Sequence, residues 1–336
     1  MSSSRALGCE RSPSPTTATS GPRSPPVRVQ PALPRGLRCS DGPRSRVLER
    51  RPPRRHLRRR RPGRAAVLLQ HGMPQCRMVA AHLEDGACEA GVLAFSRPRF
   101  GRSSWSEPSL ASCSRDALEV AAALGVDTFA VLGISFGGPF AAATAAADPE
   151  RVTAFGICVG IGPWRVLDAD APDLAAELDI LALDDQGRTD EAAAAYRELM
   201  AGAFDDMLAK ESNEELMVAF DAMVSPDGKR DVDWDAFAPP WRKRFARDVR
   251  EALTTYDGMA HDNVAVGRDW DIHLTTIRQP TYLWYGADDD LLPIEHGRWW
   301  KEQLPHAQLT IRPGTGHGGA YFIHSAEMLR TLTDSA

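Results

Sequence analysis

One short stretch constrains the fold of this chain most, because a strand, a tight turn and a helix follow one another there without a gap. The apolar run Thr128–Leu132 leads into Gly133-Ile134-Ser135-Phe136-Gly137-Gly138, and an alanine-rich helical segment follows at once. A serine at such a turn has a strained backbone that only small neighbours permit, and its hydroxyl is presented above the edge of the sheet. The Gly-x-Ser-x-Gly motif by itself is weak evidence for a nucleophile. Its position between a predicted strand and a predicted helix makes Ser135 a candidate nucleophile.

The chain from residue 65 onward alternates short apolar runs with longer helical ones. Continuously apolar runs are typical of parallel strands covered by helices on both faces. The predicted strands are Ala66–Gln70, Val92–Ser96, Thr128–Ile134, Val152–Val159, Thr281–Tyr285 and Gln308–Arg312. The predicted helices of this part are Arg115–Leu124, Phe136–Ala147, Ile294–Leu304 and Ala320–Leu332. Right-handed crossovers between such units predict an α/β fold with a doubly wound, mostly parallel sheet.

The alternation stops within residues 163–273. This interval is rich in Ala, Glu, Asp, Leu and Met at helical spacing, as in Ala192–Phe204 and Glu214–Met223, and we expect a mainly helical insertion. Its Met and Trp residues either line a pocket or fill a helical core; they include Trp164, Met200, Met207, Met217, Met223 and Trp241. The predicted organisation is a tail (1–64), a core in two parts (65–162 and 274–336) and the inserted segment (163–273).

Residues 1–64 differ in composition from the rest of the chain. They hold 11 of the 25 prolines, and 17 arginines against three acidic residues. With so few apolar residues the segment cannot offset the entropy of ordering, which predicts a disordered tail. Three alternatives stay open: an arginine arm that binds nucleic-acid phosphates, a transit peptide, and translated DNA that lies outside the native coding sequence.

The composition of the remaining residues bears on partners and location. Residues 65–336 hold 23 basic and 42 acidic residues, which argues against a nucleic-acid or anionic-membrane surface on this part. The six cysteines lack disulfide-framework or C-x-x-C spacing, so reduced thiols and a cytoplasmic location are expected. The sequence has no run of about 18 apolar residues, so we expect no membrane span. Metal-site spacings are not evident either, so we expect no metal and no cofactor.

The candidate nucleophile needs a base, and the base needs an orienting acid. The predicted strand Thr281–Tyr285 is followed by three consecutive aspartates, 288–290, and the strand Gln308–Arg312 is followed by His317 between glycines. Because the carboxyl ends of parallel strands meet at the same edge of a sheet, these side chains should face Ser135. We therefore predict His317 as the base and one of the three aspartates as the acid.

The loop after the first predicted strand is expected to complete the site. An acyl-transfer transition state needs hydrogen-bond donors for its developing oxyanion. The N–H of Phe136, at the start of the helix, is one candidate. The N–H of Met73 is the second, because Gly72 leaves room for a turn and Pro74 has no N–H. We interpret the neighbouring His71 as a structural residue that packs this loop.

Taken in chain order, these motifs resemble the α/β-hydrolase fold superfamily. The resemblance rests on His71-Gly72-Met73-Pro74, Arg97-Pro98-Arg99-Phe100-Gly101-Arg102-Ser103, the Ser135 turn, Gly286-Ala287-Asp288-Asp289 and Gly316-His317, and covers about residues 65–333. It implies a lid-type insertion. It also selects Asp289, because the family's acid commonly lies three residues after the glycine that ends its strand. The family's Asp-Arg-Pro-Gly-x-Gly-x-Ser loop is altered here, since Ser96 and Arg99 replace its first acid and one glycine.

The function expected is hydrolysis of an ester, amide or related acyl bond of a small molecule through an acyl-Ser135 intermediate. Serine at the turn, in place of aspartate, argues against the haloalkane dehalogenase and epoxide hydrolase branches. Hydrolysis of carbon–carbon bonds, cofactor-free peroxide chemistry and aminopeptidase activity stay open with the same three residues. A ligand-binding member with slow turnover, or a protein tethered to nucleic acid by its tail, are alternatives from other classes. The fold does not identify the substrate or the oligomeric state.

Overall fold

The computed structural model describes residues 65–82, 91–104, 109–168, 174–224 and 239–335. The predicted tail, residues 1–64, lies outside these ranges, as does part of the insertion.

The described residues contain one six-stranded sheet with the order β2-β1-β3-β4-β5-β6. Every pair of neighbouring strands is parallel. All residues of the central strands β1 and β3 are buried, as expected where helices cover both faces of a sheet. The strands are β1 Ala66–Gln70, β2 Gly91–Ala94, β3 Phe129–Ile134, β4 Val152–Cys158, β5 Thr281–Gly286 and β6 Gln308–Arg312. The prediction of a doubly wound parallel sheet is confirmed.

The helix α1 spans Leu110–Ala123 and begins earlier than the predicted Arg115. A reciprocal cap explains the difference. The Ser109 hydroxyl accepts a hydrogen bond from the N–H of Ser112, and the Ser112 hydroxyl accepts one from the N–H of Ser109. This capping box satisfies two N–H groups that the helix leaves unpaired, so the helix begins directly after Ser109.

The prediction of one helix over Ala320–Leu332 is wrong, because two helices occupy this part of the chain. They are α10, His317–Phe322, and α11, Ser325–Asp334. Neither Gly nor Pro marks the break at residues 323–324 in the sequence. The two helices bury separate sets of side chains: Ala320 and Tyr321 in α10, and Met328, Leu329 and Leu332 in α11.

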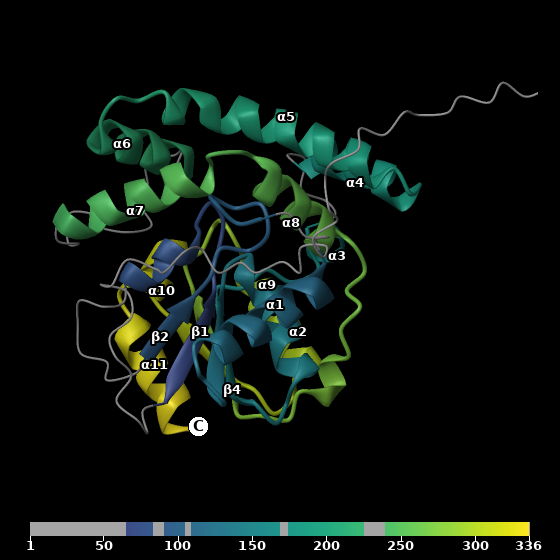
Figure 1. Ribbon diagram of the computed structural model, residues 1–336, viewed down its shortest axis with the longest axis vertical. Helices are drawn as coiled ribbons and strands as arrows, with labels where there is room; N and C mark the ends of the chain where they lie inside the picture. The colour runs from purple at the N-terminus through teal and green to yellow at the C-terminus, as the bar shows by residue number, and fades with distance from the viewer. Residues whose placement is uncertain (1–64, 83–90, 105–108, 169–173, 225–238, 336) are drawn as a thin grey trace, which may run out of the picture. The chain divides into compact units, whose positions relative to one another are not determined.

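Helices cover both faces of the sheet (Figure 1). The helices α1, α2 (Gly137–Ala147) and α9 (Ile294–Gln303) lie on one side, and α11 lies on the other. A short 3₁₀ helix, η1 (Arg77–His82), follows the loop after β1, and a second, η4 (Leu274–Thr276), precedes β5.

The described residues of the insertion are mainly helical. Figure 1 shows α4 to α8 together at one end of the strands. The helices are α3 Trp164–Leu167, α4 Ala175–Asp185, α5 Thr189–Leu208, α6 Asn213–Val224, α7 Pro239–Ala252 and α8 Asp257–Gly267. α7 begins at a pair of prolines. The first turn of a helix offers no intrahelical acceptor for a backbone N–H, so proline costs no hydrogen bond there.

Two apolar clusters join the insertion to the sheet. The first, the methionine cluster, packs side chains of α5, α6 and α7 with Met73 after β1 and Phe322 at the end of α10. The second, the tryptophan cluster, packs Trp164, α4, α5 and α8 against Phe136 and Phe140 of the turn and helix after β3. The insertion therefore contacts the loop after β1 and the end of α10 through one cluster, and the start of α2 through the other.

A buried ion pair also ties the insertion to the core. Arg97, in the loop after β2, is fully buried, and its Nε and Nη2 lie 2.8 and 2.7 Å from Oδ2 of Asp262 on α8. The Arg97 guanidinium also lies over the Phe140 ring, 4.3 Å from its centroid. Burial raises the pKa of the Asp262 carboxyl, and the Arg97 charge offsets part of that rise. Removing either partner would leave a buried charge without compensation.

We expect Asp262→Ala to lower the free energy of unfolding by about 3–5 kcal/mol, because it leaves the Arg97 charge buried and unpaired. Urea denaturation measures this. Glu295→Ala is the control, because both side chains of its ion pair with Arg298 are exposed. We expect no measurable change in the free energy of unfolding for this variant. Equally small shifts for both variants would contradict a structural role for the buried pair.

Candidate active site

The winding of the sheet reverses between β1 and β3. The chain leaves β1 for the edge strand β2, returns to β3 on the other side of β1, and then continues outward through β4, β5 and β6. In open α/β sheets, ligands bind at the carboxyl ends of the strands where the order reverses. Gly72 lies just after β1 at this point and Ser135 just after β3.

The backbone at Ser135 is strained. Its φ is 52°, in the left-handed region that side chains other than glycine rarely adopt. The turn is held because the Ser135 N–H donates to the carbonyl of Cys158 at 2.9 Å. A Cβ on Gly133 would lie 2.5 Å from the carbonyl oxygen of Gly137, and one on Gly137 would lie 2.1 Å from that of Gln70. Only glycine fits at both positions, so the tight approach of β1, β3 and α2 sets the conformation of Ser135.

Three of the predicted site residues lie in hydrogen-bond contact. The Nε2 atom of His317 is 3.1 Å from Ser135 Oγ, and its Nδ1 atom is 2.9 Å from Asp289 Oδ2. The other oxygen of Asp289 accepts hydrogen bonds from the N–H groups of Leu291 and Leu292, at 3.1 and 2.8 Å. The buried carboxylate is thus held by its own loop and faces the imidazole.

The loops that carry the acid and the histidine are bonded directly to each other. The N–H of Asp288 donates to the carbonyl of Thr315 at 3.0 Å, and a Cβ on Gly286 would lie 2.1 Å from that same oxygen. Of the three consecutive aspartates, only Asp289 is buried, while Asp288 and Asp290 are exposed. His317 is the first residue of α10, so the helix sets its backbone.

The two predicted oxyanion donors belong to different segments, Met73 to the loop after β1 and Phe136 to the turn between β3 and α2. The N–H groups of Met73 and Phe136 donate to no residue in the part of the chain that the structure describes. A Cβ on Gly72 would lie 3.2 Å from Ser135 Cβ, so the loop after β1 packs directly on the serine turn. Within the described residues neither N–H group is engaged, and both belong to segments that adjoin Ser135.

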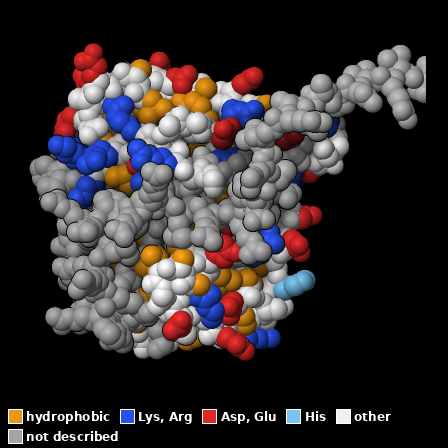
Figure 2. All heavy atoms as spheres, viewed as in Figure 1, with side chains coloured by type: hydrophobic (Ala, Val, Ile, Leu, Met, Phe, Trp, Pro, Cys, Tyr) orange, Lys and Arg blue, Asp and Glu red, His pale blue; other side chains and the backbone are white. Residues whose placement is uncertain are grey.

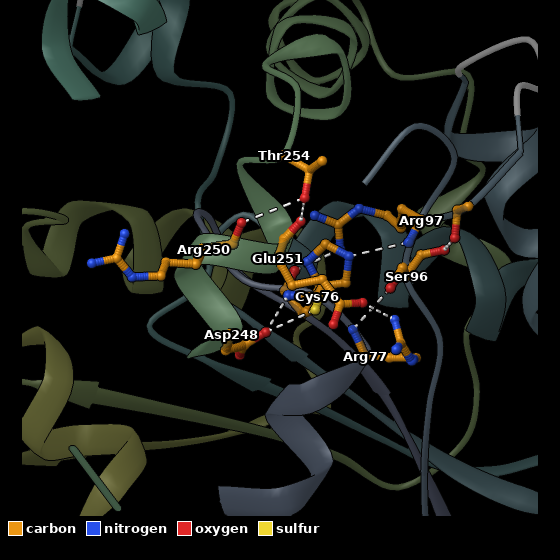
Figure 3. A network of polar contacts seen from close by, with 10 residues as sticks. Cys76, Arg77, Ser96, Arg97, Asp248, Arg250, Glu251 and Thr254 are labelled. Carbon is orange, nitrogen blue, oxygen red and sulfur yellow. Dashed lines mark hydrogen bonds and ion pairs between the residues drawn. The ribbon is translucent and has the colours of Figure 1, made fainter. Parts of the chain in front are cut away.

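An acid of the insertion holds the loop after β1 (Figure 3). Oδ1 of Asp248, on α7, accepts hydrogen bonds from the N–H and the thiol of Cys76, both at 2.9 Å. Burial, and then the Asp248 charge, raise the pKa of the Cys76 thiol, which keeps its donor proton. Arg77 and Glu251 pair beside them. Sequence analysis missed Asp248, because 172 positions separate it from Cys76 and nothing in its local sequence marks a partner.

His71 is fully buried at the other end of this loop. Its Nε2 accepts a hydrogen bond from the N–H of Arg97 at 3.1 Å, while its Nδ1 lies 2.8 Å from the carbonyl oxygen of Gly72. The proton is therefore on Nδ1. Burial, and then the charge of Arg97, lower the pKa of His71 well below its usual value. His71 is neutral and positions the loop.

No three or more His, Cys, Asp or Glu side chains of the described residues are grouped so that they could hold a metal ion. No described helix combines the length and the apolar character needed to cross a bilayer.

A family profile described as alpha/beta hydrolase fold matches residues 65–322. The chain belongs to this family. This α/β-hydrolase is 27% identical over 207 residues to the pimeloyl-(acyl-carrier protein) methyl ester esterase of Chromobacterium violaceum, a match that covers 61% of this chain and 68% of that protein.

Solved structures share the fold of this α/β-hydrolase. A thermophilic esterase from Thermogutta terrifontis aligns with a TM-score of 0.54 and 19% identity, over 80% of this chain and 90% of that one. A bromoperoxidase from Bacillus anthracis aligns with a TM-score of 0.55 and 17% identity, over 81% and 91%.

The contacts of Asp289 predict how reactive Ser135 is. We expect Asp289→Asn to slow labelling of Ser135 by a fluorophosphonate at least about a hundredfold, because an amide favours the wrong tautomer of His317. Asp290→Asn is the matched control and should label at the wild-type rate, since its carboxylate is exposed. Gel-based labelling over time measures both rates. Equal rates in the two variants would contradict the role of Asp289.

Proposed function

We propose that this chain is a serine hydrolase that cleaves an ester, amide or related acyl bond through an acyl-Ser135 intermediate. The observation that carries the proposal is the chain of contacts from Ser135 Oγ through His317 to the buried Asp289, at the reversal point of the sheet. A strained serine next to a base, which is oriented in turn by an acid, is the arrangement that activates a hydroxyl.

The proposed reaction follows from these contacts. His317 Nε2 takes the proton of Ser135 as Oγ adds to the acyl carbon, and the carbonyl electron pair moves to oxygen. The N–H groups of Met73 and Phe136 stabilise this oxyanion. The electron pair on the oxyanion then re-forms the carbonyl, and the bond to the leaving group breaks. The imidazolium gives its proton to that group. Asp289 stabilises the imidazolium meanwhile. Water, activated by His317, releases the acid and restores Ser135.

The similar proteins support an ester as the substrate class. The curated relative is named as a methyl ester esterase and one of the structural neighbours as an esterase. We therefore infer a small-molecule ester whose acyl carbonyl reaches Ser135.

The insertion is proposed to act as a lid with an apolar lining on one side. Met200 on α5 is partly buried in the methionine cluster, together with Met73 of the loop after β1 and Phe322 of α10. Trp164, in contrast, is only 4% exposed within the tryptophan cluster. We infer that Met200 contacts the apolar part of the substrate, while Trp164 fills the core of the insertion.

Replacement of the nucleophile tests the proposed function. We expect Ser135→Ala to reduce hydrolysis of p-nitrophenyl acetate at least about a thousandfold and to abolish fluorophosphonate labelling, because loss of a triad nucleophile removes the acyl intermediate. The melting temperature should change little, since alanine fits the turn. Residual activity above about a hundredth of wild type would contradict the assignment. Labelling of the wild type without turnover of any acyl ester would favour a ligand-binding protein.

The lid proposal predicts a dependence on substrate size. We expect Met200→Ala to raise KM for p-nitrophenyl octanoate several-fold more than for the acetate, because only the longer chain draws binding energy from the lid. Met223→Ala, on the exposed side of α6, should affect neither. Steady-state kinetics with both esters measure this. Uniform losses on both esters would mean that Met200 only holds the insertion together.

A further inference from the structure

A second strained residue lies beside Ser135, at the end of the neighbouring strand. Val159 directly follows β4, and its φ is 44°, in the same left-handed region as the φ of 52° at Ser135. A β-branched side chain is an outlier in that region. Strain of this kind persists only where other contacts hold it, and it gathers at functional sites. The contacts that hold Val159 therefore indicate what the turn is for.

The segment around Val159 braces the backbone of Ser135 on both sides. The N–H of Ser135 donates to the carbonyl of Cys158 at 2.9 Å, and the carbonyl of Ser135 accepts the N–H of Ile161 at 3.2 Å. Val159 lies between the two residues that make these bonds. The left-handed turn at Val159 is therefore what lets Cys158 and Ile161 bond to the same serine.

The hydroxyl of Tyr285 holds this turn from β5. It donates to the carbonyl of Gly160 at 2.7 Å. Burial raises the pKa of Tyr285 well above its usual value, so the hydroxyl keeps its donor proton. The ring is packed against α9, because a Cβ on Gly297 would lie 2.8 Å from Tyr285 Cδ2. Both Tyr285 and Gly160 are buried, so the charged side chains on the surface in Figure 2 take no part in this contact.

The strand that carries Tyr285 also carries the acid. Tyr285 is the last residue but one of β5, and Asp289 follows in the loop after that strand. Asp289 bonds to His317, and His317 lies 3.1 Å from Ser135 Oγ. The bond from Tyr285 to Gly160 therefore ties the support of the nucleophile to the strand that positions the acid and, through it, the base.

We propose that Tyr285 is a positioning residue, which holds the Ser135 hydroxyl within reach of His317 by fixing the turn at Val159. This inference rests on the proposed function. Without the tyrosine hydroxyl, Val159 relaxes toward an ordinary backbone conformation, and the two bonds that brace Ser135 weaken. Proton transfer from Oγ requires a hydrogen bond to the base, so a small displacement of the serine slows its attack on an acyl carbon.

Tyr285→Phe tests the proposal, because it removes only the hydroxyl. We expect the rate constant of fluorophosphonate labelling and kcat/KM for p-nitrophenyl acetate to fall at least about tenfold. Tyr282→Phe is the matched control. Tyr282 lies near the other end of β5, and its hydroxyl shares a hydrogen bond of 2.7 Å with the Ser335 hydroxyl. This variant also loses one hydrogen bond, and we expect it to label at the wild-type rate.

A double variant separates positioning from stability. Glycine adopts a left-handed backbone at little cost, so Val159→Gly removes the need for the tyrosine hydroxyl. We expect Tyr285→Phe combined with Val159→Gly to label within about threefold of the wild-type rate. Its melting temperature should nevertheless lie below that of Tyr285→Phe, because the fully buried Val159 side chain is lost. Recovery of the rate together with a loss of stability is not expected for a tyrosine that only stabilises the core.

The outcomes are distinct. Labelling of Tyr285→Phe at the wild-type rate, equal losses of rate in the two tyrosine variants, or no recovery in a folded double variant would overturn the role of Tyr285 while leaving Ser135 as nucleophile. If the double variant does not fold, the comparison of Tyr285→Phe with Tyr282→Phe decides. Activity retained by Ser135→Ala would instead overturn the proposed function itself.

Discussion

The close approach of β1, β3 and α2 around Ser135 is the contact on which the rest of the site depends. Ser135 adopts a left-handed backbone because the chain must turn from β3 into α2 within the space that Gly133 and Gly137 leave. Strain of this kind persists only where the surrounding structure over-determines it. The parallel sheet and its buried central strands provide that surrounding structure, so the rigid core holds the serine hydroxyl at the reversal point of the sheet.

The sheet also brings together residues that are distant in the sequence. Ser135 and His317 are separated by 182 positions and His317 and Asp289 by 28, yet all three follow strands that end at the same edge. The direct bond between the loops after β5 and β6 adds a second constraint, because it sets the acid relative to the histidine. Polar groups held in this way need little rearrangement when charge develops beside them.

The insertion contributes to the site through charge as well as through apolar contact. Asp262 pairs with Arg97, which supports His71, and Asp248 accepts both donors of Cys76. Two buried acids of the insertion therefore hold the two ends of the loop that carries Met73. Buried carboxylates need such partners, because desolvation without compensation is costly. The geometry of the loop after β1 thus depends on helices about 170 positions away in the chain.

The sequence by itself determined the fold class, because the period of apolar residues distinguishes strands from helices and the glycines mark the turn at Ser135. It also placed Ser135, Met73, Phe136 and His317 directly after strands, where sheet topology makes them neighbours. The residues alone left Asp288, Asp289 and Asp290 equivalent, and only the tertiary structure buries one of them against His317. The break between α10 and α11 and the partners Asp248 and Asp262 were not foreseeable either. Local patterns encode local periodicity, whereas a pairing across more than a hundred residues depends on how the helices of the insertion pack on the sheet.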